Sequence, residues 1–195
     1  MPTPTTPDLL RALDERRSVP SKQLGEPAPS DEVLLQMLRS ASRVPDHGKL
    51  APFRFIRIQG DARRQLGDIL AARTEELDPE AGTVAIEKDR NRFNSAPLVI
   101  VVVASLIPEH KVPEDEQWMT AGSVCFALLV AAQAFGFGAQ WLTGWAAYDG
   151  LVAQRLGLAE TERVAGFIHI GTPKLAAPER ERPDPARLLS DWTPA

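Results

Sequence analysis

Two arginine pairs near opposite ends of the chain have the residue types to bind an anion. Arg16 and Arg17 precede Ser18 at the predicted end of a helix, and Arg180 and Arg182 stand one residue apart in an extended tail. A guanidinium group binds phosphate through two parallel N–H donors, and a serine hydroxyl adds a third donor. Each pair also has a plainer explanation, because cations at a helix C-terminus suit the helix dipole and charged tails are usually solvated. The sequence alone leaves both explanations open.

The loop between residues 43 and 53 is a second candidate for ligand contacts. It contains Arg43 and His47, and prolines at 45 and 52 restrict its backbone. Loops held in this way between a helix and a strand often contact ligands. A simple connector is an equally good explanation.

A glycine pair follows the most apolar part of the chain. Gly136 and Gly138 form half of a dinucleotide fingerprint, but the third glycine is missing. The pair also lies between a predicted helix and a following strand, which is the reverse of the order that a phosphate-binding turn requires. We therefore expect a tight turn with close packing here.

Metal and nucleophile chemistry have little support. The three histidines, His47, His110 and His169, show no metal-binding spacing, so no metal site is expected. Cys125 falls among apolar residues of a predicted helix and is expected to be an inert core thiol. His169 falls inside a predicted strand and is expected to be a hydrogen-bonded core histidine.

Length and composition predict an ordinary globular protein. The 195 residues predict a single domain over residues 1–195, with a loose leader at 1–6 and an extended tail at 172–195. The net charge of −4 gives no bulk electrostatic support for binding nucleic acid or a membrane surface. A single cysteine excludes an internal disulfide and fits a reducing, cytoplasmic location.

The chain is organised around a long apolar stretch, Glu114–Gly144. Proline and a run of acids before it predict a helix start, and the apolar residues predict a helix to Phe135 that is buried on every face. A membrane span is disfavoured because Gly122, Ser123 and Gln133 dilute the stretch.

The remaining elements predict an α+β protein. Periodicity and capping residues indicate helices over 7–16, 30–43, 61–76, 81–94 (outside the core) and 151–156. Apolar and β-branched runs indicate strands over 53–59, 98–104, 139–143 and 164–170. We expect a sheet of about four strands with helices on both faces, and the second strand in its centre.

The order of these motifs matches a known family. An Arg-Arg-Ser helix end is followed by a Pro-Asp-His loop that closes on Ala-Pro-Phe, then by His-Lys-Val-Pro, an Ala-Gly-containing core helix and Gly-Phe-Gly-x-x-Trp-x-x-Gly. From Pro7 to about Pro185 the chain resembles the nitroreductase-like FMN flavoproteins, and specifically their minimal bacterial NAD(P)H nitroreductase branch. The resemblance implies a mixed or antiparallel sheet around the core helix, with a possible C-terminal strand from a partner. It also implies a homodimer with FMN at the subunit interface.

The same resemblance nominates site residues. Arg43 and His47 would come from the partner subunit, and Leu142–Gly144 would lie along the flavin ring and offer a backbone N–H. The implied FMN contacts are Arg16, Arg17, Ser18, Arg43, His47, Leu142, Thr143, Gly144, Arg180 and Arg182, and the implied NAD(P) contacts are Ala132, Gln133, Ala134, Phe135, Gly136 and Phe137. The chain departs from many relatives at Pro20, Asp46, Lys49 and Ala51.

The implied activity is hydride transfer from NADH or NADPH to flavin N5, then electron transfer to a small acceptor such as a nitroaromatic or quinone, with ping-pong kinetics. No catalytic protein residue is expected, because the flavin does the chemistry. Arg17 or Lys49 could stabilise the reduced flavin. Two alternatives remain: a flavin-binding or flavin-handling protein with little turnover, and a helical interaction module without flavin. Ala121, Gly122 and Ser123 would permit close approach of the partner helix.

Overall fold

The computed structural model describes the backbone of residues 8–194 and the side chains of residues 10–194. The helices are α1 (Asp8–Asp14), α2 (Asp31–Ala41), α3 (Asp61–Leu77), α4 (Thr83–Arg90), α5 (Glu114–Ala134) and α6 (Gly150–Arg155). The strands are β1 (Leu24–Gly25), β2 (Phe53–Gln59), β3 (Leu98–Ser105), β4 (Gly138–Leu142) and β5 (Glu162–Pro173).

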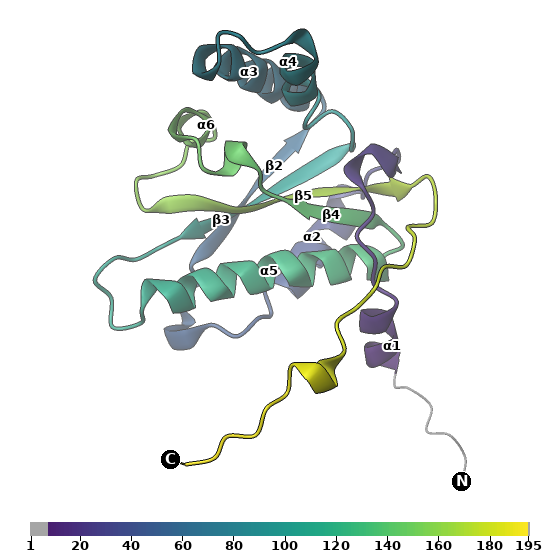
Figure 1. Ribbon diagram of the computed structural model, residues 1–195, viewed down its shortest axis with the longest axis vertical. Coiled ribbons are helices and arrows are strands. Elements are labelled where there is room, and N and C mark those ends of the chain that lie inside the picture. The colour runs from purple at the N-terminus through teal and green to yellow at the C-terminus, as the bar shows by residue number, and fades with distance from the viewer. Residues whose placement is uncertain (1–7, 195) are drawn as a thin grey trace.

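The five strands form one antiparallel sheet (Figure 1), in which β5 makes most of the connections. The strand order is β1-β5-β3-β2, and β4 pairs with β5 outside this path. The first part of β5 pairs with β3, its residues 167–171 pair with β4, and its last two residues pair with β1. The long strand therefore holds β4, which leads into the predicted flavin segment, against the rest of the sheet.

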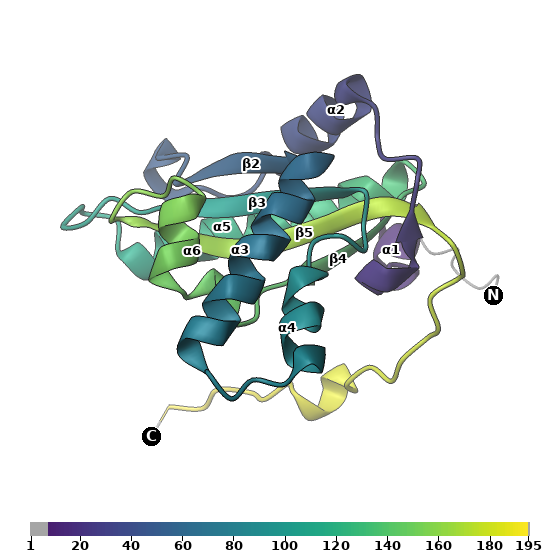
Figure 2. The same ribbon diagram turned by 90° about the horizontal axis from the view of Figure 1, so that it is seen from above.

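Helices cover both faces of this sheet, as Figures 1 and 2 show. One core lies between the sheet and α2 and α5, and the other lies between the sheet and α3 and α6. Alternate residues of β3 enter the two cores: Ile100 faces the first and Val101 the second. Because both faces are covered, the strand is a continuous apolar run rather than an alternating one. The central position predicted for it is confirmed.

Local signals at two helix ends act as the sequence indicates. The Ser30 hydroxyl caps α2 by accepting a hydrogen bond from the Val33 N–H at 3.3 Å. At the end of α5, the Phe137 N–H donates to the Ala132 carbonyl at 2.9 Å, and Gly136 has a φ of +80°. This left-handed glycine closes the helix and turns the chain into β4, as predicted.

The structure corrects three predicted elements. Residues 8–194 contain five strands rather than about four, because the short β1 lies in the proline-containing loop after α1. The fourth helix is shorter than residues 81–94, and Phe93 beyond its end is fully buried in the second core. The predicted tail, 172–195, begins two residues too early, since β5 runs to Pro173. Pro7 and the leader at 1–6 lie outside the described residues.

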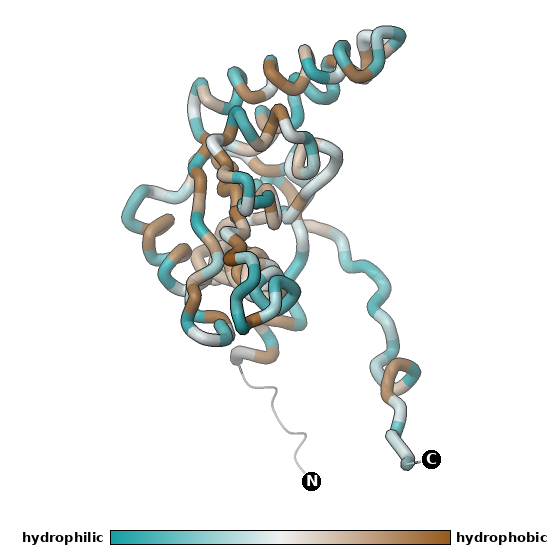
Figure 3. The backbone as a smooth tube through the Cα atoms, turned by 90° about the vertical axis from the view of Figure 1, so that its left-hand side faces the viewer, coloured by the Kyte–Doolittle hydropathy of each residue, from teal (hydrophilic) through white to brown (hydrophobic). Residues whose placement is uncertain are grey.

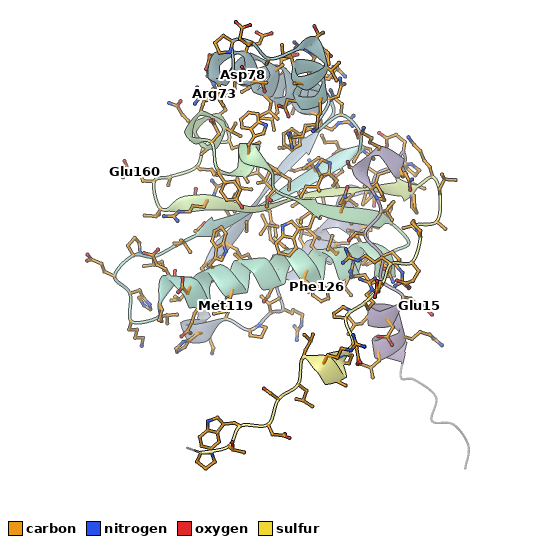
Figure 4. The ribbon with its side chains drawn as sticks, viewed as in Figure 1. Glu15, Arg73, Asp78, Met119, Phe126 and Glu160 are labelled. Carbon is orange, nitrogen blue, oxygen red and sulfur yellow. The ribbon has the colours of Figure 1, made fainter. Side chains whose placement is uncertain are left out.

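The prediction that the core helix is buried on every face is wrong. Trp118, Met119 and Phe126 are 37%, 61% and 44% exposed, and Figure 4 labels the last two on the outer side of α5. Within residues 8–194, α5 is the one helix long and apolar enough to cross a membrane, and half of its most apolar window is buried inside the fold. A helix with one buried and one exposed apolar face needs a second surface to cover it.

Candidate functional site

The two arginine pairs come together at one end of the molecule. Burial lowers the pKa of Arg16, and the charges of Arg182, Arg180 and Arg17 lower it further. The Arg17 guanidinium is fixed by the backbone of two preceding residues, since Nη1 donates to the carbonyls of Asp14 at 2.5 Å and Arg16 at 3.0 Å. Four like charges gathered in this way repel one another, and an anion between them would relieve the repulsion.

An acidic residue of the tail already lies in this arginine cluster, which we define as Arg16, Arg17, Arg180 and Arg182. The Glu179 carboxylate forms ion pairs with Arg17 and, at 3.5 Å, with Arg182. Its side chain is 57% exposed. The tail lies apart from the main body of the fold in Figure 3 and is mostly hydrophilic. Tertiary structure thus brings the tail arginines to the α1 end, which neither local segment could specify.

The segment after Ser18 joins the arginine cluster to β4. The Val19 N–H donates to the Ala139 carbonyl at 3.0 Å, and the Ser21 N–H donates to Gln140 Oε1 at 2.6 Å. Gly138 lets the two segments approach, because a Cβ there would lie 2.7 Å from a Leu24 methyl group. A strand rises about 3.4 Å per residue, so the end of β4 at Leu142 lies roughly 10 Å from Ala139, and Gly144 follows two residues later.

Gly144 ends this path with an unusual backbone conformation. Its φ of +68° and ψ of −175° are accessible to glycine and strained for other residues. Its carbonyl accepts a hydrogen bond from the Ala147 N–H at 3.2 Å. Its own N–H donates to no acceptor among residues 8–194, and the residue is exposed. The predicted flavin segment therefore ends in a backbone donor that is available to a ligand.

A polar network beside Gly144 was not predicted from the sequence. Arg92 Nε donates to Asp89 Oδ1 at 3.1 Å, and Nη2 donates to the same oxygen. The other Asp89 oxygen accepts from Thr74 Oγ1 at 2.8 Å and from Trp145 Nε1 at 3.2 Å. Burial alone would raise the pKa of Asp89, but the hydrogen bonds from Arg92 and Thr74 outweigh burial and hold the pKa below its ordinary value. In the sequence, only the three-residue spacing between Asp89 and Arg92 points to this network. The same spacing is common on exposed helices, so it does not identify a buried ion pair.

The loop at 43–53 does not reach the arginine cluster of its own chain. Arg43 is exposed, and His47 Nδ1 lies 2.6 Å from a carboxylate oxygen of Glu116 in the first turn of α5. Arg16 lies beside a later part of α5, because its guanidinium carbon is 5.9 Å from the centre of the Phe126 ring. Ten helical residues span about 15 Å. One chain alone therefore leaves these two predicted groups of FMN residues apart.

The residues predicted to contact NAD(P) have mixed exposure. Ala132 is fully buried in the first core, and Phe137 is partly buried against it. The amide of Gln133 donates to the Ala12 carbonyl at 3.2 Å. Ala134, Phe135 and Gly136 are exposed. A cavity of about 220 Å³ beside Arg17, Gln133 and Gly136 connects this turn to the arginine cluster.

The exposed face of α5 borders an apolar groove of about 690 Å³. The groove is lined by Val44, Pro45, Trp118, Met119, Gly122, Ser123, Phe126 and Ala127. A Cβ on Gly122 would meet no atom within 4 Å, so the chain's own packing does not require glycine there. Ala121 is fully buried in the chain's own core, and the expectation that it faces a partner is wrong.

Comparison with known proteins decides the family. The Nitroreductase family model matches residues 13–172. The chain is 39% identical over 186 residues to the Escherichia coli K12 protein named "Putative NAD(P)H nitroreductase YdjA", covering 94% of this chain and 98% of that protein. A Haemophilus influenzae protein named "Putative NAD(P)H nitroreductase" is 37% identical, with coverage of 85% and 88%. The chain belongs to the nitroreductase family.

Solved structures of the family have the same fold. A nitroreductase-like protein from Bacillus cereus has a TM-score of 0.80 at 26% identity, covering 96% of this chain and 97% of that chain. A structure from Desulfovibrio desulfuricans, described as a nitroreductase in complex with FMN, has a TM-score of 0.75 at 26% identity, covering 97% and 100%. The α+β nitroreductase-like fold that the resemblance implied is therefore confirmed.

Two buried groups of this nitroreductase-family chain lie away from the arginine cluster. Burial raises the pKa of Cys125 to about 12, which fits the expected inert thiol. The expectation of a hydrogen-bonded His169 is wrong: the ring is fully buried and stacked on Phe93, and neither ring nitrogen has a partner among the described residues. Burial, with a smaller effect of the Arg92 charge, lowers the pKa of His169 to about 4.

Two carboxylates outside the arginine cluster, Asp149 and Glu162, make hydrogen bonds that stabilise the fold. A cavity of about 560 Å³ between the start of α5 and α6 includes Asp149 and Glu162. Asp149 caps α6 by accepting from the Val152 N–H, and hydrogen bonds from Arg54 hold the pKa of Glu162 at about 2. Within residues 8–194, no group of three or more His, Cys, Asp or Glu side chains gathers in a metal-binding arrangement.

Proposed function

We propose that this protein is an FMN-dependent oxidoreductase that acts as a homodimer. It takes hydride from NADH or NADPH and passes electrons to a small acceptor such as a nitroaromatic or a quinone, in a ping-pong sequence. The observation that carries this proposal is the convergence of four arginines, drawn from the two ends of the chain, at the beginning of β4. The FMN named in the Desulfovibrio structure supports the choice of cofactor.

The residues present fit a flavin mononucleotide. Arg16, Arg17, Arg180 and Arg182 supply guanidinium donors for a phosphate dianion, whose charge exceeds that of the single Glu179 carboxylate. Just beyond the other end of β4, Gly144 supplies a backbone N–H that has no acceptor among the described residues. FMN, when bound, supplies the redox chemistry, and the chain supplies binding, orientation and electrostatics.

No protein acid or base is assigned a step in this proposal. Among the described residues, His169 is buried and neutral at neutral pH, and Cys125 is buried and protonated. The carboxylate of Asp46, in the loop assigned to the partner site, accepts hydrogen bonds from the N–H groups of Leu50 and Ala51 at 3.2 and 2.8 Å. These two hydrogen bonds fix the loop.

The position of the apolar groove supports a dimer that completes the site. Suppose that two copies of α5 pack antiparallel about a twofold axis near Gly122 and Ser123. The Glu116 end of one helix then lies beside residue 128 or 129 of the other, because an isologous contact pairs positions symmetrically about the axis. His47, which contacts Glu116, would thereby approach Arg16 of the other copy, which lies over Phe126. The two groups that one chain leaves apart would meet across the interface.

The first test is the visible absorption spectrum of the purified protein. We expect a yellow protein whose absorbance near the flavin bands bleaches on addition of NADH or NADPH and returns on addition of a quinone or nitroaromatic. A colourless protein that does not take up added FMN would contradict the proposal. A yellow protein that oxidises neither nicotinamide would instead assign it to flavin binding or handling without turnover.

Replacement of Gly122 by leucine tests the dimer. Leucine is favourable in a helix and finds open space within the chain, so the monomer should fold. We expect the variant to elute as a monomer and to lose most of its FMN together with its partner. Gly82→Leu, at another glycine with open space around its Cβ position but far from α5, should remain dimeric and yellow. A dimeric, yellow Gly122→Leu protein would overturn the proposed interface.

A further inference from the structure

The loop at 43–53 has an unusual backbone at its centre. Lys49 and Ala51 have φ values of +55° and +47°, in the left-handed region, and they are two of the three non-glycine residues with this conformation among residues 8–194. Both are exposed, so the packing of their side chains does not impose it. Left-handed backbone is strained for a residue with a Cβ. Other contacts must therefore hold the loop in this shape.

Asp46 supplies these contacts. One carboxylate oxygen accepts a hydrogen bond from the Leu50 N–H at 3.2 Å, and the other accepts from the Ala51 N–H at 2.8 Å. The Asp46 carbonyl accepts from the Lys49 N–H at 3.1 Å. Aspartate side chains commonly fix turns by accepting from the N–H groups that follow them. Three successive backbone donors end on this one residue, and both left-handed residues lie within the turn that it closes.

The turn at 46–51 is attached to the helix that borders the apolar groove. His47 Nδ1 lies 2.6 Å from a carboxylate oxygen of Glu116, and Thr120 Oγ1 donates to the Pro45 carbonyl at 3.2 Å. Glu116 and Thr120 stand four residues apart on α5, so they lie on the same side of the helix. The turn is therefore fixed relative to α5. Packing of α5 against another copy would also fix where the turn lies on that copy.

We propose that Asp46 positions this turn for the FMN site of the other subunit. The inference rests on the proposed FMN function and its dimer, in which His47 approaches the arginine cluster of the other copy. A turn that is already held in its binding shape loses little conformational freedom when the ligand arrives, and this preorganisation raises affinity. Asp46 is a positioning residue: it acts through the backbone of residues 49–51 and does not itself touch the flavin.

The experiment compares Asp46→Ala with the wild-type protein and with Asp78→Ala. Asp78 also accepts a hydrogen bond within a turn, from the Glu80 N–H at 3.1 Å. Figure 4 places it at the opposite end of the molecule from Met119 of α5, so it is a matched control. The measurements are the dissociation constant of FMN, by flavin fluorescence quenching with FMN-free protein, and the oligomeric state, by size-exclusion chromatography. Neither readout depends on turnover.

We expect Asp46→Ala to remain dimeric and to bind FMN about tenfold more weakly, because two hydrogen bonds that hold the binding shape are lost. Asp78→Ala should stay within about twofold of the wild type. A folded, dimeric Asp46→Ala protein with wild-type affinity would overturn the inference. So would a monomeric one, since Asp46 would then act on dimer assembly, and so would equal weakening in Asp78→Ala, which would indicate a general loss of stability.

A double variant tests whether Asp46 acts through the backbone. Glycine adopts a φ of +47° without strain, so Ala51→Gly added to Asp46→Ala should recover about threefold of the lost affinity. A double variant that binds no more tightly than Asp46→Ala would overturn the inference.

If Asp46→Ala does not fold, Asp46→Asn gives the result. Its amide keeps one of the two acceptor oxygens, so FMN binding should weaken by about threefold, and unchanged binding there also overturns the inference. A wild-type protein that does not take up FMN would instead be a failure of the proposed function, and this is recognised before any variant is made.

Discussion

The two ends of β4 hold positive charge in opposite ways. At the beginning of the strand, the arginine cluster is assembled from both chain ends at the surface, and Glu179 competes for its donors. At the other end, Arg92 is held by a buried carboxylate that also accepts from Thr74 and Trp145. Surface charges are adjustable and screened by salt, whereas a buried pair is rigid and costly to break. The first arrangement suits the capture of a phosphate, as proposed above, and the second suits a guanidinium group whose position stays fixed.

The largest expected effect on stability comes from removing the buried carboxylate of Asp89. Asp89→Ala removes the partner of Arg92 and one acceptor each for Thr74 and Trp145, so we expect it to lower the free energy of unfolding by about 3 kcal/mol. The measurement is urea denaturation followed by far-UV circular dichroism. Asp68→Ala, which removes a surface partner of Arg90, should cost less than about 1 kcal/mol. Equal losses in the two variants would remove the contrast between buried and exposed pairs.

Replacement of His169, which lies near Arg92, should have a smaller effect on stability, and this effect depends on pH. Its folded pKa of about 4 lies below its ordinary value of 6.5, so the unfolded chain binds a proton that the folded chain does not. The contribution of His169 to stability is therefore fully present above about pH 6.5 and declines as the pH falls toward 4. We expect His169→Leu to lose this part of the decline.

At neutral pH the same His169→Leu variant should match or exceed the wild-type free energy of unfolding, by up to about 1 kcal/mol, because it removes two buried nitrogens that have no partner in the described part of the chain. Urea midpoints of both proteins at neutral and at acid pH provide the measurement. Since other groups contribute to acid unfolding, the decisive quantity is the difference between the two proteins. A difference that does not change with pH would contradict the pKa assignment.

The smallest expected effect is at the exposed end. Glu179→Gln removes the carboxylate that competes for Arg17 and Arg182, so we expect FMN to bind about threefold more tightly, as suits exposed ion pairs. Flavin fluorescence quenching at low and at high salt measures the change, which should shrink as salt screens the cluster. Glu181→Gln, at the next acid along the tail, should have a weaker effect. Looser binding in Glu179→Gln would mean that Glu179 orders the tail rather than competes with phosphate.

The sequence by itself determined most of the secondary structure. Phe53–Gln59 has the predicted bounds, and β3 extends its predicted range by one residue, because β-branched and apolar runs have few alternatives to a buried strand. Ser30 and Gly136 mark helix ends through local hydrogen bonds and backbone preference, which need no tertiary context. The family resemblance also came from linear order, and it pointed to both arginine pairs.

Only the tertiary structure decided which of these residues meet. β1 has two residues and exists because β5 is there to pair with it. The exposed face of α5 could not be recognised, since apolar residues that pack inside a chain and those left for another surface look alike in sequence. In the sequence, Arg92 belongs to the stretch 81–94, which was expected to form a helix outside the core. Its position at Gly144 depends on a carboxylate from α4, a hydroxyl from α3 and an indole after β4, and such contacts between distant segments are set by packing, which no local pattern encodes.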